Sequence, residues 1–297
     1  MVNIKISTIS FILTIYFQIN SCSQTEINQV NKDSLSTKSI VYKKIIRNRI
    51  ITHLNYKIAN SQPLIIHTFV PLCDNANQGI IKVGAKLGDG RNLKTNLYWG
   101  AGYGLKTYFT RSKEWKYIKS FFDPDSSVLE RAIYFRMYPN NAKVYLILDA
   151  YKGDKMEDCV INYFHSLAGI IKDTLQIDSI KIPAFGNSDF IIFNGHNGLM
   201  DNEYKLIESI DLIEKDAAVI SCASYNYFIG YFPRLRAYPL ITTTNFLPPE
   251  AYIISAIIDN WATIQPDEKI RTSAGEAMAK IHKTAVKPCI NTFKTGW

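Results

Sequence analysis

The sequence has 297 residues, of which 47% are hydrophobic and 20% charged. This composition excludes a wholly disordered chain, a collagen and a coiled coil, and it supplies the apolar residues for a sizeable core. The net charge of +8 at pH 7 is modest for this length, so it indicates solubility, and we expect no nucleic acid as a partner because no recognition motif accompanies it.

The first 22 residues resemble the signal peptide of a bacterial lipoprotein. Lys5 gives a short positive region, and residues 6–19 are uncharged and mostly apolar, which is shorter than a membrane-spanning helix of about 20 residues. Ile19-Asn20-Ser21-Cys22 then resembles a lipobox, with Cys22 as the lipidation site. The alternative is an ordinary cleaved signal with an incidental cysteine, and both alternatives predict export to an oxidising compartment.

The remainder of the sequence predicts a tether and one folded domain. Residues 23–38 are polar and are typical of a flexible tether between a bilayer and a domain. Residues 39–297 predict a single α/β domain. We therefore expect a lipid-anchored protein of the bacterial cell envelope, at the outer membrane or the cell surface.

Within the domain, apolar runs alternate with amphipathic stretches. Residues 39–60 predict a helix that leads into the domain. Short apolar runs predict strands at 63–70, 143–150, 189–193, 217–220 and 240–244. Helical spacing and start signals predict helices at 97–109, 156–171, 203–213, 248–261 and 276–282. Strands separated by helices indicate βαβ units, so the sequence predicts an α/β fold, a mostly parallel sheet with helices on both faces.

Two of the predicted strands are followed by residues that can do covalent chemistry. His196 follows the third predicted strand between glycines 195 and 198, and Cys222 follows the fourth. If these strands are adjacent, both side chains lie at the carboxyl edge of the sheet, where such sheets bind ligands. Imidazole can activate a thiol, a helix amino terminus after Cys222 would stabilise the thiolate, and the glycines would let the backbone approach a substrate. The backbone N–H groups of Gly198 and Cys222 could then face a developing oxyanion.

This pattern resembles the caspase–hemoglobinase superfamily, which includes caspases, legumains, gingipains and clostripain. The two matching blocks are Phe190-Ile191-Ile192-Phe193-Asn194-Gly195-His196 and Ala217-Ala218-Val219-Ile220-Ser221-Cys222. The resemblance implies a mainly parallel sheet between helices, with His196 as general base or acid and Cys222 as nucleophile. In that family a glycine usually follows the histidine directly, whereas Asn197 intervenes here. Cys222 follows His196 by 26 residues, against about 50 in caspases, which is closer to gingipain-like members.

The sequence therefore predicts an exported, lipid-anchored cysteine peptidase or related amide hydrolase. It would cleave a peptide or protein substrate through a thioester intermediate and would need no metal and no organic cofactor. The alternative is a non-catalytic envelope lipoprotein of the same fold that binds a peptide or a glycan at the same edge. In both cases the chain contacts the membrane through its lipid anchor.

Four further polar residues are candidates for a substrate rim around the same edge. Asp74 and Asp149 both follow apolar runs that predict strands. Asn194 and Asp201 flank the His196 loop. The two strand-end aspartates could orient an imidazole or bind a basic substrate group, while Asn194 and Asp201 are equally ambiguous. Capping of a loop is the alternative for the strand-end aspartates.

Four cysteines remain after Cys22, at positions 73, 159, 222 and 289. An even count permits two disulfides in three pairings, and none of the spacings is typical of a zinc site. If Cys222 stays free as a nucleophile, at most one disulfide can form among the other three.

Overall fold

The computed structural model describes residues 44–297. The predicted signal peptide, the lipidation site Cys22, the tether and residues 39–43 of the predicted first helix lie outside the described residues. Residues 47–297 belong to one structural unit. None of the helices in the described range has the length and apolar character that crossing a bilayer requires.

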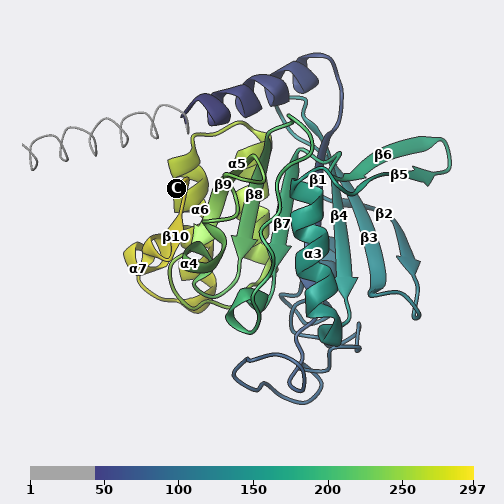
Figure 1. The fold of residues 1–297 in the computed structure, drawn as a ribbon, viewed down its shortest axis with the longest axis vertical. Helices are drawn as coiled ribbons and strands as arrows, with labels where there is room; N and C mark the ends of the chain where they lie inside the picture. Colours follow the sequence, from purple (N-terminus) through teal and green to yellow (C-terminus); the bar gives the residue numbers. More distant parts are fainter. Residues whose placement is uncertain (1–43) are drawn as a thin grey trace, which may run out of the picture. The chain divides into compact units, whose positions relative to one another are not determined.

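A mixed sheet of eight strands forms the centre of this unit, in the order β10-β9-β8-β7-β1-β4-β3-β2 (Figure 1). The strands are β1 (Leu64–Pro71), β2 (Lys116–Phe122), β3 (Val128–Met137), β4 (Lys143–Tyr151), β7 (Phe190–Asn194), β8 (Lys215–Ile220), β9 (Ala237–Thr243) and β10 (Phe293–Lys294). The run from β9 to β4 is parallel, and β2, β3 and β10 are antiparallel to their neighbours. The five parallel strands are the five that the apolar runs predict, so the mostly parallel α/β sheet is confirmed.

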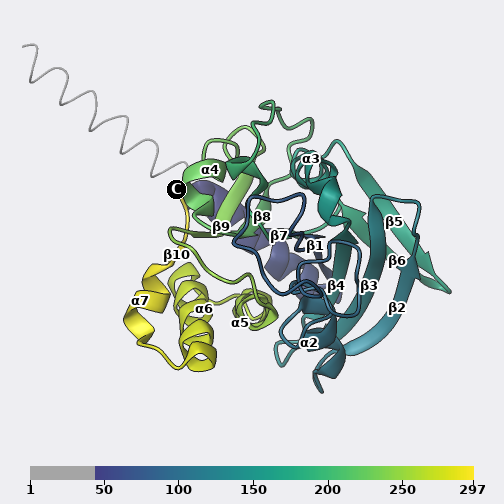
Figure 2. The same ribbon diagram turned by 90° about the horizontal axis from the view of Figure 1, so that it is seen from below.

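Helices cover both faces of the sheet, as predicted (Figure 2). One face carries α3 (Met156–Leu167) and α4 (Ser224–Phe228); the other carries α2 (Leu105–Arg111), α5 (Ala251–Ala262) and α6 (Asp267–His282), and α7 (Val286–Asn291) packs on α6. Successive side chains of a strand point to opposite faces. Phe193 accordingly packs on Tyr163 of α3, whereas Phe190 packs on Trp261 of α5. Because both faces are covered, the central strands read as continuous apolar runs.

Two connecting segments differ from the sequence-based expectation. Residues 203–213 contain no helix, so the helix predicted there is wrong. Backbone hydrogen bonds hold this segment open, from Ser209 N to the Arg234 carbonyl and from Ile210 N to the Ala168 carbonyl, both at 2.9 Å. The predicted helix 97–109 forms only from Leu105 onward, because turns occupy the glycine-containing part before it.

The elements that the apolar pattern did not predict lie at the margin of the sheet. They are strands β2 and β3 and the separate hairpin of β5 (Lys172–Ile177) and β6 (Ile180–Phe185). Strand β2 forms the end of the sheet, and most of its residues are exposed to solvent. Such strands carry no continuous apolar run, because only part of their surface is buried.

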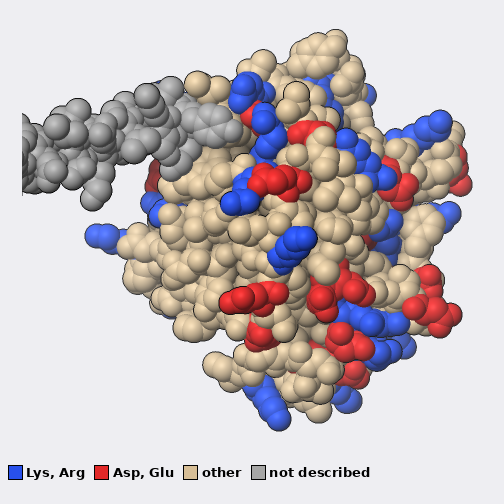
Figure 3. Space-filling model, in the orientation of Figure 1, with Lys and Arg blue, Asp and Glu red and all other residues tan. Residues whose placement is uncertain are grey.

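Charged side chains of both signs are interspersed on the face shown in Figure 3. Several of the exposed charges are paired, for example Arg91 with Asp154 and Arg234 with Glu208, each at 2.8 Å. Pairs of this kind contribute little to stability, because water screens both partners.

Candidate active site

His196 and Cys222 occupy matching positions beyond two neighbouring parallel strands. Strand β7 pairs with β8 in the register that places Asn194 opposite Ile220, and Gly195 N donates to the Ile220 carbonyl at 3.2 Å. Each of the two residues comes two positions after the last residue of its strand. Both therefore lie at the carboxyl edge of the sheet, and the expected adjacency of the two strands is confirmed.

Asn197 ties the two loops together. Its side-chain N–H donates to the Cys222 carbonyl oxygen at 2.8 Å, and its Oδ1 accepts from Leu199 N at 3.1 Å. The second bond caps the short 3₁₀ helix η2 (Gly198–Met200). Asn197 is completely buried. The residue that interrupts the family pattern thus has a structural role in this chain, since it fixes the histidine loop against the cysteine turn.

The His196 imidazole is oriented by Asp201. The exposed fraction of His196 is 7%, and its Nε2 lies 2.7 Å from Asp201 Oδ2. An ionised carboxylate only accepts hydrogen bonds, so in the neutral ring Nε2 carries the proton and Nδ1 keeps its lone pair. Within the described residues Nδ1 has no hydrogen-bond partner. This arrangement leaves Nδ1 available as a base, while Gly79 N, at 3.2 Å from the same carboxylate oxygen, steadies Asp201.

Cys222 sits in a sharp turn between β8 and α4. Its thiol donates to the Leu247 carbonyl oxygen at 3.6 Å, and no hydrogen bond joins it to His196 within the described chain. The next residue, Ala223, has a φ of 48°, which is a left-handed conformation that costs a non-glycine residue about 1–3 kcal/mol. Such a strained turn between a strand and a helix exposes the side chain at its apex.

Buried hydrogen bonds hold this turn in place. Ser224 Oγ donates to the Val219 carbonyl at 2.8 Å and accepts from Thr243 N of the neighbouring strand at 2.9 Å. Helix α4 contains only five residues. A helix this short supplies little dipole stabilisation, so the expected help of a helix amino terminus to the thiolate is small.

The two glycines that flank His196 are closely packed against other side chains. A Cβ atom at Gly195 would lie 2.8 Å from Pro71 Cγ, and one at Gly198 would lie 2.8 Å from Met156 Cγ. Both distances are too short for real side chains. The close approach that these glycines permit is therefore to β1 and α3, whereas the sequence suggested an approach to a substrate.

The two backbone N–H groups expected to face an oxyanion, those of Gly198 and Cys222, form no hydrogen bond among the described residues. The partly exposed Cys222 thus has an unpaired amide of its own, and a second lies in the loop that Asn197 attaches to it. Such amides are the groups that stabilise a developing oxyanion in acyl transfer.

Comparison with known proteins adds no family to this geometry. No protein-family model, no curated protein and no solved structure matches the chain. The resemblance to the caspase–hemoglobinase superfamily therefore stands on the histidine and cysteine blocks of the sequence alone.

The four cysteines in the described residues are all free thiols. The disulfides that their even number permits are therefore not formed. Cys73, Cys159 and Cys289 are buried, whereas Cys222 is partly exposed. Burial raises the pKa of Cys73 to about 11 and also raises the pKa of Cys159 and of Cys289. The buried thiols are consequently poor nucleophiles at neutral pH.

Of the four rim candidates, Asp201 alone contacts His196. Asp74 caps its own loop, with Oδ1 accepting from Ala76 N at 2.8 Å, which is the loop-capping alternative. Asn194 is completely buried, and its amide donates to the Pro249 carbonyl at 3.0 Å, ahead of α5. Neither side chain forms a hydrogen bond with His196 or Cys222 among the described residues.

Asp149, the fourth candidate, lies in a separate buried cluster. Its Oδ2 is 2.9 Å from His67 Nε2, and Arg131 binds both carboxylate oxygens at 2.6 and 2.7 Å. The other ring nitrogen of His67 accepts from Phe185 N at 2.9 Å. Burial favours the neutral acid, but Arg131 and His67 outweigh it and hold the pKa of Asp149 well below its usual range. Burial also lowers the pKa of His67.

The sequence contained no clear signal for three of these features. The Asn197 link, the Ser224 network and the His67–Asp149 pair all join residues on different strands or loops. Their formation depends on strand order and register, which apolar patterning does not determine. Only the Asn197 link had any signal in the sequence: Asn197 stands where the caspase–hemoglobinase pattern usually has glycine.

Proposed function

We propose that this chain is a cysteine hydrolase that cleaves a peptide or amide bond, with Cys222 as nucleophile and His196 as general base. The observation that carries the proposal is the matched placement of His196 and Cys222 beyond neighbouring parallel strands, with Asn197 bonded to the Cys222 carbonyl at 2.8 Å. A nucleophile, a base and a group that orients the base then occur in one place, which is the usual constellation of covalent hydrolysis.

The reaction begins when the Cys222 side chain rotates away from the Leu247 carbonyl toward His196. His196 Nδ1 takes the thiol proton, and the sulfur attacks the substrate carbonyl carbon. The amides of Gly198 and Cys222 stabilise the resulting oxyanion. The intermediate collapses, the amine leaves with the proton from His196, and a thioester to Cys222 remains. His196 then deprotonates a water molecule, which hydrolyses the thioester to a carboxylic acid and restores the thiol.

Asp201 is a positioning residue in this scheme. Its carboxylate holds Nε2 at 2.7 Å and so keeps Nδ1 as the basic nitrogen. When the ring becomes an imidazolium, the same carboxylate stabilises the positive charge. The side chain of Asp201 is 26% exposed, so its replacement would not leave a buried cavity.

The finer fold assignment and the location belong to the same proposal. A caspase–hemoglobinase-like fold is supported by the His and Cys blocks on adjacent strands β7 and β8, inside a sheet covered by helices on both faces. Attachment to the envelope through a lipid on Cys22 is supported by the sequence of residues 1–22. The substrate is then a peptide or protein that reaches the envelope.

The direct experiment is cleavage of a mixed peptide library by the purified domain, with products identified by mass spectrometry. We expect cleavage by the wild type and by Cys289→Ala, which removes a buried thiol remote from His196, and no cleavage by Cys222→Ala. A covalent thioester on Cys222, trapped at low pH, would identify the intermediate. Cleavage that survives in Cys222→Ala would contradict the proposal.

A non-catalytic binding protein is the second candidate. It is favoured by one observation, the thiol bonded to the Leu247 carbonyl instead of His196. In that case no library peptide is cleaved, and peptides or glycans bind equally well to the wild type and to Cys222→Ala. A catalytic site instead predicts cleavage by the wild type and none by Cys222→Ala, because acylation requires the sulfur.

A further inference from the structure

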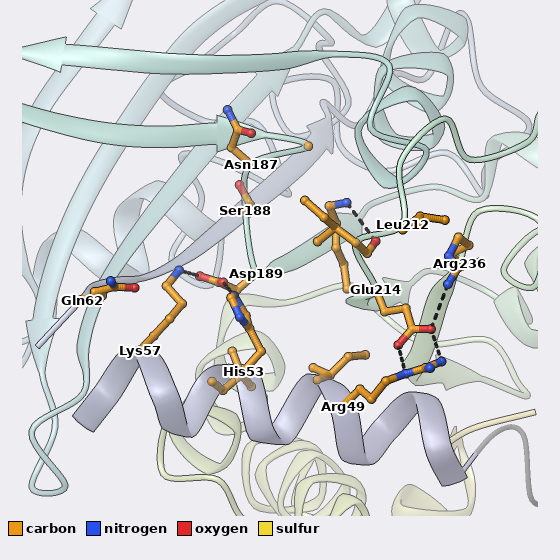
Figure 4. A pocket seen from close by; sticks show the side chains of 15 residues that line it. Arg49, His53, Lys57, Gln62, Asn187, Ser188, Asp189, Leu212, Glu214 and Arg236 are labelled. Carbon is orange, nitrogen blue, oxygen red and sulfur yellow. Dashed lines mark hydrogen bonds and ion pairs between the residues drawn. The ribbon is translucent and has the colours of Figure 1, made fainter. Parts of the chain in front are cut away.

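A hollow of about 710 Å³ opens at the amino-terminal edge of the sheet, at the other end of the strands from His196 and Cys222 (Figure 4). The helix of residues 44–59 forms one wall, and the segments that lead into β7, β8 and β9 form the others. Its charged residues are Arg49, Lys57, Asp189, Glu214, Lys215 and Arg236.

Cations outnumber carboxylates in this lining. Arg49 and Arg236 share Glu214, with Arg49 Nε at 2.8 Å and Arg236 Nη2 at 3.3 Å, while Lys57 pairs with Asp189. These pairs are drawn in Figure 4. The lining therefore contains four basic side chains, Arg49, Lys57, Lys215 and Arg236, and two carboxylates. Among the lining residues basic side chains exceed carboxylates by two, and Asp211, just outside the lining, approaches Lys215 at 3.6 Å.

Lys215 is a buried cation with few close hydrogen-bond acceptors. It is 1% exposed, yet its ammonium donates only to the Ile213 carbonyl at 3.3 Å, and the nearest paired carboxylate, Asp211, is 3.6 Å away. An ammonium has three donors, and burial without partners is costly. Burial lowers the pKa of Lys215. A bound anion would supply the missing acceptors.

A buried hydroxyl in the same wall also lacks a partner. Ser188 is 3% exposed, and within the described residues its Oγ makes no hydrogen bond. Buried polar groups are normally paired, so an orphan of this kind in a cavity wall calls for an explanation. An oxygen of a ligand would satisfy this donor.

The lining also contains apolar residues, interspersed with the charged ones. They include Ile50, Leu54, Leu212 and Ile213, of which Leu212 is 81% exposed. Large exposed aliphatic side chains beside a charged hollow suit a ligand that has both an anionic group and an apolar part.

We propose that this hollow is a binding site for a small organic anion, whose carboxylate or phosphate group contacts Lys215, Arg236 and Ser188 and whose apolar part packs against Leu212. The ligand is distinct from the substrate at Cys222, because the two sites lie at opposite ends of the parallel strands. Its binding does not depend on the proposed hydrolysis.

The test is isothermal titration calorimetry with three probes: butyrate, butyl phosphate and inorganic phosphate. We expect saturable binding of at least one butyl probe, and weaker binding of inorganic phosphate because it lacks the apolar part. Whichever butyl probe binds more tightly identifies the anionic group. Higher ionic strength should weaken binding, since salt screens charges near a surface.

Variants of the wall locate the binding site. Arg236→Gln and Lys215→Met should each raise the Kd of the butyl probe at least about tenfold, which corresponds to about 1.4 kcal/mol. The matched control is Lys181→Met, on the β5–β6 hairpin, where an exposed lysine is removed. Arg236 is partly exposed, so Arg236→Gln tests the site even if Lys215→Met fails to fold.

Three results would overturn the proposal. The first is absence of saturable binding of both butyl probes, and the second is binding that is unchanged in Arg236→Gln. The third is binding to vesicles that contain phosphatidic acid together with no binding of butyl phosphate, which would make the surface a lipid contact and not a small-molecule site.

Discussion

Among the described residues, two buried histidines each contact an aspartate, and the two rings differ in the partner of the second nitrogen. In both pairs Nε2 lies against a carboxylate, at 2.9 Å from Asp149 for His67 and at 2.7 Å from Asp201 for His196. In His67 the remaining nitrogen accepts from Phe185 N. In His196 it has no partner among the described residues.

This difference separates a structural pair from one that can do chemistry. His67 is completely buried, and Arg131 already neutralises the Asp149 carboxylate beside it. Both ring nitrogens of His67 have hydrogen-bond partners, so neither is available to take a proton from a substrate. His196 keeps an unpartnered ring nitrogen at the same sheet edge as Cys222, whose side chain is partly exposed. A histidine–aspartate contact alone is therefore a weak indicator of a general base, whereas a second ring nitrogen without a partner is a stronger one.

The largest expected contrast is in stability. Asp149→Asn should lower the free energy of unfolding by about 3–5 kcal/mol, because it leaves the Arg131 charge without its buried partner. Asp201→Asn is the matched change in the other pair and should cost less than about 1 kcal/mol. Urea denaturation of both variants measures the difference, and equal losses would contradict the distinction between the pairs.

The second contrast is in chemical access to the two rings. Diethyl pyrocarbonate acylates a neutral imidazole nitrogen, so His196 should react at least about 100-fold faster than His67, whose modification requires local opening worth about 2.7 kcal/mol or more. Peptide mapping by mass spectrometry gives both rates in one sample. Comparable rates would show that the His67 cluster opens readily.

The third contrast is in pH dependence. Burial lowers the pKa of His67 in the folded protein, whereas the unfolded value is about 6.5. Below about pH 6.5 the unfolded chain gains a proton that the folded chain resists, so stability falls as the pH falls, by at most about 1.4 kcal/mol per unit. His67→Gln should remove this slope between about pH 7 and 5.

Comparison of the wild type with His67→Gln separates the contribution of His67 from that of the other titrating groups. Asp216, whose pKa burial raises to about 6, acts with the opposite sign in the acidic range, but it is present in both proteins. Urea denaturation at a series of pH values provides the curves. Parallel curves for the wild type and His67→Gln would mean that His67 does not resist protonation.

The smallest expected effect concerns the hydrogen bond that joins the His196 loop to the Cys222 turn. Asn197→Ala removes the hydrogen bond to the Cys222 carbonyl and should cost about 1 kcal/mol of stability. Because this bond also sets the position of the thiol relative to His196, peptide cleavage should fall by a larger factor than stability alone explains. A variant with normal cleavage would show that Asn197 only stabilises the fold.

Much of the central sheet could be predicted from the sequence. Each of the five parallel strands is buried on both faces, so each appears as a short apolar run, and the runs at 189–193 and 217–220 placed His196 and Cys222 beyond strand ends. Because β7 and β8 are adjacent and parallel, both residues then lie at the same edge of the sheet.

The remaining features depended on long-range contacts. Residues 203–213 have helical spacing of apolar residues, but backbone bonds to Arg234 and Ala168 keep the segment open. Asp149 was expected at the rim because it comes near the end of a strand; its actual partners, His67 and Arg131, come from neighbouring strands whose register the sequence does not encode in any simple pattern.

The central claim is that His196 activates Cys222, and the rate of thiol alkylation tests it most directly. With iodoacetamide at about pH 7, Cys222 should react before the buried Cys73, Cys159 and Cys289, and its rate should fall about 10- to 30-fold in His196→Ala, since an isolated thiol is only a few per cent ionised at this pH. His165→Ala, a histidine on α3, should leave the rate unchanged. If Cys222 reacts equally fast in the wild type and in His196→Ala, His196 is not its base.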